Sequence, residues 1–132
     1  MTLDIGHAER SVEIAVEMLD RVDPSTRGLW PRAAALLGRQ ALEDAISWVW
    51  VVHAPGMDEC SMRAQLLCLN EYLGDEELSE EARFVYARLS WACHHHAYDL
   101  APTAIELRGW LGGVQRLIRA TREVATANPR ND

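Results

Sequence analysis

Apolar residues recur every three or four positions through most of the chain, which is the spacing of amphipathic helices. Breaks in this spacing separate five segments: 2–22, 31–53, 58–73, 79–93 and 103–124. No segment has a partner strand with which to form a sheet, so the pattern predicts an all-α fold. We expect one domain over residues 1–132, an antiparallel bundle of about five helices joined by short loops.

Helix-end signals support these boundaries. Gly74 stands where glycine commonly ends a helix, and Ser79 can cap the next helix. Thr103 and Glu106 have the spacing of a capping box, which predicts the start of the last helix. Gly112 and Gly113 inside this helix favour close packing over a break. The tail from 127 to 132 should fray.

The segment Ile46–Val52 is apolar on nearly every side. Its β-branched and aromatic residues also suit a buried strand, but an isolated strand could not satisfy its backbone hydrogen bonds. We therefore predict a helix that is either central in the bundle or in contact with a second protomer. In the second case Trp50 would lie in the interface.

The formal net charge is −7, and all thirteen basic residues are arginine. The absence of lysine excludes Schiff-base chemistry and a P-loop, and suggests a GC-rich bacterial genome. A strongly acidic chain is also a poor general coat for nucleic acid. The charge is uneven, because residues 58–83 carry eight acids and two arginines, whereas 103–126 carry four arginines and two glutamates.

No apolar run approaches the roughly 20 residues that a membrane-spanning helix needs. The first ten residues have neither the features of a signal peptide nor those of a transit peptide. Cys60, Cys68 and Cys93 form no Cys-x-x-Cys pair, and their odd number suits reduced, mostly buried thiols. We therefore expect a cytoplasmic protein with no contact with a membrane.

Candidate chemistry concentrates in residues 88–102, which hold three of the five histidines, a cysteine, a tyrosine and an aspartate. Consecutive helical residues point about 100° apart, so His94, His95 and His96 cannot all bind one ion. No second Cys/His pair completes a site, and we expect neither a metal nor another cofactor. A Cys93–His dyad is a further alternative, but Cys93 continues the inner stripe of its helix and is more simply a core residue.

Arg88 offers another interpretation, because His94 and His95 follow it by six and seven residues. On a continuous helix Arg88 and His95 share a face, roughly 10 Å apart along the axis. If the helix ends near His94, that side chain can instead turn back toward Arg88. Such a pair suits RNA cleavage without a metal, in which histidine takes the 2′-hydroxyl proton and arginine stabilises the charge on the phosphate.

The Arg-x(4–6)-His arrangement at the end of a late helix resembles the HEPN superfamily (higher eukaryotes and prokaryotes nucleotide-binding). The segment Leu36–Ala45, with Arg39-Gln40-Ala41-Leu42-Glu43, is similar to a helix of its bacterial branches. The resemblance covers about 31–117. It implies a helical core that forms a homodimer, with two Arg/His sites facing one cleft. Many members are ribonucleases of toxin–antitoxin or phage-defence systems, and others have lost catalysis.

His96-Ala97-Tyr98 is similar to the His-x-Tyr ending of one toxin branch, in which a nucleotidyltransferase antitoxin modifies the tyrosine. The resemblance thus implies Arg88, His94 and His95 as catalytic residues. His96 and Tyr98 would bind substrate or be modified, and the partners would be RNA and an antitoxin.

A non-catalytic bundle that serves as a dimerisation or protein-interaction module is the alternative. Arg88 would then pair with Glu81 or Asp99, and the imidazoles would cap carbonyls at the helix end. Arg39 and Glu43 have the spacing of an ordinary ion pair on one helix.

Overall fold

The computed structural model describes residues 4–21, 30–94 and 100–126, and this part of the chain is helical without any strand. The predicted all-α bundle is confirmed. The residues 95–99 and the tail 127–132 lie outside the described ranges. The elements are α1 (Ile5–Asp20), α2 (Trp30–His53), the 3-10 helix η2 (Met57–Glu59), α3 (Met62–Cys68), α4 (Asn70–Leu73), α5 (Glu76–Cys93) and α6 (Ala104–Thr126).

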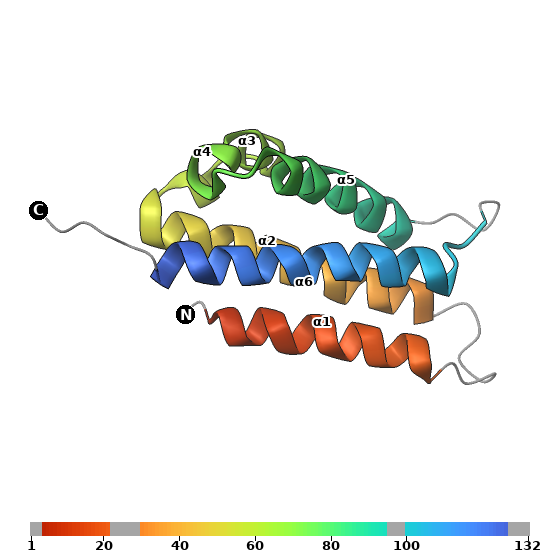
Figure 1. Ribbon diagram of the computed structural model, residues 1–132. Helices are drawn as coiled ribbons and strands as arrows, with labels where there is room; N and C mark the ends of the chain where they lie inside the picture. Colours follow the sequence, from red (N-terminus) through yellow and green to blue (C-terminus); the bar gives the residue numbers. More distant parts are fainter. Residues whose placement is uncertain (1–3, 22–29, 95–99, 127–132) are drawn as a thin grey trace, which may run out of the picture.

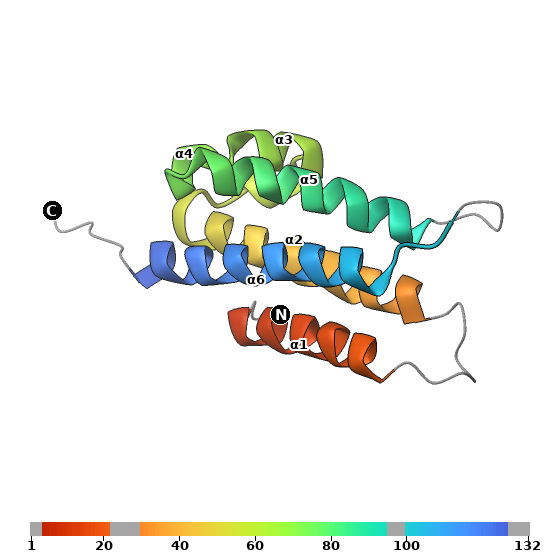
Figure 2. The same ribbon diagram turned by 45° about the vertical axis from the view of Figure 1, so that its right-hand side comes forward.

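The long helices α2 and α6 lie side by side in the middle of the molecule and run in the same direction (Figures 1 and 2). Helix α1 packs on one side of this pair and α5 on the other, and both run in the opposite direction. The short helices α3 and α4 lie beside the start of α5. As a result, α5 ends and α6 begins at one end of the bundle, where α1 also ends and α2 begins.

Helix α2 occupies the centre because one side of it is built from small residues. Ala34, Ala35, Ala41 and Ala45 are all fully buried. A Cβ atom on Gly38 would lie only 2.5 Å from Leu111 Cδ2, so the glycine permits the close approach of α2 and α6. Small side chains therefore let α2 contact three long helices at once.

The apolar segment 46–52 is part of this central helix. Trp50 is fully buried, and its indole Nε1–H donates to Gln65 Oε1 at 2.9 Å. The amide of Gln65 in turn donates to the Cys60 carbonyl oxygen at 2.8 Å. The prediction of a central helix is confirmed, and the interpretation of Trp50 as an interface residue is wrong because its side chain completes the core.

The last helix begins as its sequence predicts. The Glu106 backbone N–H donates to Thr103 Oγ1, and the Thr103 N–H donates to Glu106 Oε1, each at 3.1 Å. This reciprocal pair is a capping box. Helix α6 continues through Gly112 and Gly113, and a Cβ on Gly113 would lie 2.9 Å from Val85 Cγ2. The prediction that the glycines allow close packing is confirmed at Gly113.

Two other boundaries differ in detail from the prediction. The third predicted helix is divided into α3 and α4 at Leu69, and it ends at Gly74 with a positive φ of 63°. Helix α5 is capped by Asp75, whose carboxylate accepts from the Leu78 N–H at 3.1 Å. Ser79 is therefore not the cap: it is buried in the first turn, where its hydroxyl donates to the Asp75 carbonyl oxygen.

None of the helices in the described ranges is long and apolar enough to cross a membrane.

Candidate functional site at the end of α5

Helix α5 carries the candidate residues on its outer surface. Arg88 is exposed, and its guanidinium carbon lies 5.3 Å from the centre of the Phe84 ring. Phe84 and Trp91 are 53% and 41% exposed, although both are large aromatic side chains. Phe84, Arg88 and Trp91 are three or four residues apart, so they form one stripe along α5. This α5 stripe combines a permanent cation with apolar surface.

His94 is exposed at the position that closes α5. Its backbone N–H donates to the carbonyl oxygens of Ser90 and Trp91 at 3.3 and 3.1 Å. The adjacent carbonyl oxygen of Cys93 accepts a hydrogen bond of 2.8 Å from Arg32 Nε, on the first turn of α2. An arginine from another helix therefore caps this carbonyl, where the sequence suggested an imidazole.

Arg88 and His94 do not converge within one chain. Six helical residues correspond to a rotation of about 600°, which leaves the two side chains about 120° apart around the axis and about 9 Å apart along it. His95, His96 and Tyr98 lie outside the residues that the structure describes. The helix places Arg88 beside Phe84 and Trp91, and places His94 at the end of the same helix.

The alternative ion pair of Arg88 with Glu81 does not form, because the Glu81 carboxylate binds Arg116 of α6. Asp99, the other proposed partner, lies outside the described residues. In the described part of the chain, the exposed Arg88 guanidinium lies against the Phe84 ring and has no carboxylate partner.

Arg39 and Glu43 form the ion pair that their spacing suggests, with 3.1 Å between Arg39 Nε and Glu43 Oε1. Tyr86 of α5 joins them: its hydroxyl donates to Glu43 Oε1 at 3.4 Å, and the Arg39 guanidinium carbon lies 5.9 Å from its ring centre. The hydrogen bond to Glu43 raises the pKa of Arg39 still further above its ordinary value. This cluster connects α2 to α5 and has no direct contact with Arg88 in the part of the chain described.

Cys93 is buried beside this cluster and is unsuited to nucleophilic chemistry. Burial raises the pKa of the Cys93 thiol, while the nearby guanidinium of Arg39 acts in the opposite direction. A raised pKa keeps the thiol protonated at neutral pH, and the thiolate is the nucleophilic form. Cys60, by contrast, is exposed, so the expectation of buried thiols is wrong for that residue.

The other described histidines lie away from this end. His53 ends α2 at the opposite end of the bundle, and its Nε2 lies 3.3 Å from the Val124 carbonyl oxygen. His7 is exposed on α1. Within the described ranges, no three His, Cys, Asp or Glu side chains converge as a metal site would require.

The arginines of the net-basic α6 largely face carboxylates of neighbouring helices. Arg108 lies 2.8 Å from Asp20 and Arg122 lies 2.9 Å from Glu9, both on α1, while Arg116 pairs with Glu81 on α5. Three of the four arginines of the last helix thus form ion pairs with carboxylates of the neighbouring helices α1 and α5. This arrangement does not create a free basic surface for nucleic acid.

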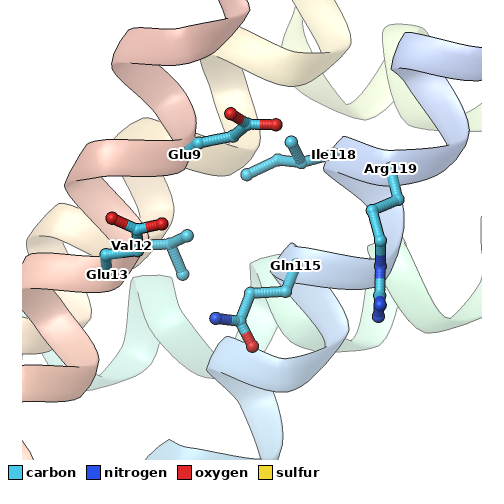
Figure 3. Close-up of a pocket in the computed structure, with 6 residues that line it drawn as sticks. All are labelled: Glu9, Val12, Glu13, Gln115, Ile118 and Arg119. Carbon is cyan, nitrogen blue, oxygen red and sulfur yellow. The ribbon is translucent and has the colours of Figure 1, made fainter.

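A groove between α1 and α6 is a feature that the sequence did not suggest (Figure 3). Its cavity of about 270 Å³ is lined by Glu9, Val12, Glu13, Gln115, Ile118 and Arg119. Figure 3 shows Glu9, Val12 and Glu13 of α1 on one side of the groove and Gln115, Ile118 and Arg119 of α6 on the other. None of the six side chains is an imidazole, a hydroxyl or a thiol, and the Glu9 carboxylate lies 2.9 Å from Arg122.

The four polar residues of this groove form two pairs with i,i+4 spacing, Glu9 with Glu13 on α1 and Gln115 with Arg119 on α6. That spacing identifies a face of each helix, but only the packing of the first helix against the last brings the faces together.

Comparisons of the chain with protein-family models, with curated proteins and with solved structures find no match. A functional assignment therefore rests on the residues and geometry of the chain itself.

Proposed function

We propose that the chain is an HEPN-like helical protein that acts, as a homodimer, as an RNA endonuclease independent of metal ions. The observation that carries the proposal is the exposed Arg88, which lies against Phe84 on a helix that ends at an exposed His94. When the 2′-hydroxyl of an RNA attacks the adjacent phosphate, histidine can accept the hydroxyl proton and arginine can stabilise the charge on the phosphate. The resemblance to HEPN nucleases supports the same assignment.

Arg88 and His94 point in different directions within one chain, but a symmetric dimer would bring Arg88 of one subunit close to His94 of the partner subunit. Each residue is three positions from Trp91, so two antiparallel α5 helices that cross at Trp91 would bring Arg88 opposite His94 of the partner subunit. Trp91 and Phe84 are exposed apolar side chains on the stripe that such a contact would bury. Leu100 and Ile105, which are 90% and 84% exposed near the same end of the bundle, would extend the interface.

In this dimer His94 would take the proton of the 2′-hydroxyl while the 2′-oxygen attacks phosphorus. The bond from phosphorus to the 5′-oxygen then breaks, and an imidazolium returns a proton to that leaving oxygen. Arg88 would neutralise the charge that develops on the non-bridging oxygens. The products are a 2′,3′-cyclic phosphate and a 5′-hydroxyl. His95 is the second candidate for the acid or the base, and His96 and Tyr98 would contact the RNA or, for Tyr98, be modified by a nucleotidyltransferase antitoxin.

The test is cleavage of a labelled single-stranded RNA in the presence of EDTA. We expect the wild type to cleave it and to leave a cyclic phosphate. Arg88→Ala and His94→Ala should each lower the rate by about 10²–10⁴-fold, because each removes a group that acts only in the transition state. Arg10→Ala and His7→Ala, which alter exposed residues of the same types on α1, are the matched controls. Equal rates in Arg88→Ala, His94→Ala and the wild type would refute the proposal.

The second candidate is a non-catalytic bundle that binds itself or another protein. The exposed Phe84, Trp91, Leu100 and Ile105 favour it, because apolar side chains that gather on one part of a surface often mark an interface. It predicts no RNA cleavage by the wild type. It also predicts an assembly that survives Arg88→Ala and His94→Ala, since neither change removes the apolar contacts.

A further inference from the structure

A second cavity lies between α3 and α5 and has a different character from the groove of Figure 3. It has a volume of about 280 Å³ and is lined by Arg63, Leu66 and Leu67 of α3 with Arg83, Tyr86 and Ala87 of α5. We call it the α3–α5 pocket. Its walls are almost entirely carbon, and Arg63 and Arg83 are the only charged residues among the six that line it.

The apolar surface of this pocket is exposed. Leu66 forms part of the core and is only 6% exposed, but its neighbour Leu67 is 60% exposed and Ala87 is exposed as well. Tyr86 is held in place on its far side, because its hydroxyl donates to Glu43. This hydrogen bond fixes one wall of the pocket, and covering the exposed Leu67 and Ala87 with an apolar side chain would remove carbon surface from water.

The charged residues that line the pocket are positive, although the stretch of sequence that supplies them is acidic. Residues 58–83 contain eight acids and two arginines, and those two arginines, Arg63 and Arg83, are the ones that line the pocket. Arg83 lies 4.0 Å from Glu80, and both side chains are more than 40% exposed, so this ion pair is weak and easily exchanged. Two accessible cations beside an apolar pocket fit a ligand that carries carboxylates next to an apolar group.

We propose that the α3–α5 pocket binds an acidic amphipathic helix of a partner protein, with one large apolar side chain in the pocket and carboxylates on Arg63 and Arg83. The cavity is at the lower limit for a small-molecule site and suits a single side chain. Helices bind in this way when apolar anchors and acids recur within one or two turns. The site does not depend on RNA cleavage, because neither Arg88 nor His94 lines it.

The probe is a labelled, stapled helical peptide with leucine on one face and glutamate on the flanks. Fluorescence anisotropy measures its affinity, and amide shifts in NMR spectra of the whole chain locate it. We expect saturable binding, with the largest shifts in 63–67 and 83–87. Peptides with lysine in place of glutamate, or with alanine in place of leucine, should bind at least about tenfold more weakly because each removes one of the two complementary features.

Two protein variants test the same pocket. Ala87→Glu places a carboxylate in the pocket, and Arg63→Glu with Arg83→Glu reverses its charge; each should weaken the acidic peptide about tenfold or more, and the double variant should prefer the lysine peptide. Arg10→Glu with Arg21→Glu, at exposed positions on α1 and directly after it, is the control with an equal change in net charge. Circular dichroism verifies that each variant is folded.

Several results would overturn the proposal. Equal affinity for the acidic and lysine peptides would show that Arg63 and Arg83 do not select carboxylates. Shifts that map away from the α3–α5 pocket would show that the peptide binds elsewhere. If the pocket resonances shift with protein concentration alone, a second copy of the chain is the occupant. If an RNA oligomer produces the same shifts in place of the peptide, the ligand is nucleic acid.

Discussion

Gln65 supplies the hydrogen-bond acceptor for the buried indole N–H of Trp50. It is only 4% exposed, accepts from Trp50 Nε1 at 2.9 Å, and donates to the Cys60 carbonyl oxygen at 2.8 Å. One side chain thus satisfies a buried donor on α2 and a carbonyl of the loop before α3. A buried polar group without such a partner would cost free energy comparable to a lost hydrogen bond.

We therefore expect Gln65→Met to lower the free energy of unfolding by about 1–3 kcal/mol, since it preserves volume but leaves the Trp50 N–H unpaired. Urea denaturation followed by tryptophan fluorescence measures the change. Gln40→Met, on an exposed position of α2, is the control and should change stability by less than about 0.5 kcal/mol. Equal stability of the two variants would mean that the hydrogen bond adds nothing to the fold.

At the level of helices, glycines decide how closely α2 and α6 approach. Gly38 and Gly109 both lie within helices, but their surroundings differ. A Cβ on Gly38 would meet Leu111 Cδ2 at 2.5 Å, and Leu111 is fully buried. A Cβ on Gly109 would meet nothing within 4 Å. The same residue type is thus required at one position and only tolerated at the other.

Gly38→Ala should destabilise the protein by about 1–2 kcal/mol, because overpacking outweighs the better helix propensity of alanine. Gly109→Ala should stabilise it by about 0.5–1 kcal/mol, since only the propensity changes. Thermal unfolding measured by circular dichroism compares the two. A stabilised Gly38→Ala would show that the α2–α6 contact can relax to accept a methyl group.

For the molecule as a whole, the uneven charge is explained mainly by internal pairing. The basic α6 lies between α1 and α5 and pairs with acids on both. These pairs are largely exposed, so each adds little stability. Arg63, Arg83 and Arg88 are exposed on α3 and α5 and take no part in these interhelix pairs.

The proposed dimer gives a prediction at this same level. Trp91→Glu places a charge at the centre of the proposed interface, so the variant should remain folded but become monomeric in light scattering. It should also lose RNA cleavage, because Arg88 would no longer meet His94 of the partner subunit. Ile14→Glu, at a side chain that is 50% exposed on α1, is the control and should remain dimeric. A wild type that is monomeric at the concentration at which it cleaves RNA would contradict the dimeric site.

The sequence alone determined the features that depend on neighbouring residues. The three-to-four-residue spacing predicted the helices, Gly74 the end of α4, and Thr103 with Glu106 the start of α6. It also identified the Arg39–Glu43 pair. Capping bonds and i,i+4 contacts join residues of one short segment, so their physics is contained in that segment.

Only the tertiary structure decided which faces of these helices meet. It buried Trp50 against Gln65, brought Arg32 to the carbonyl of Cys93, and joined Arg63 to Arg83 in one pocket. The reason is that each long helix buries a face against other long helices of the bundle. Which face it buries depends on the shapes of partners far away in the sequence, and local periodicity does not contain that information.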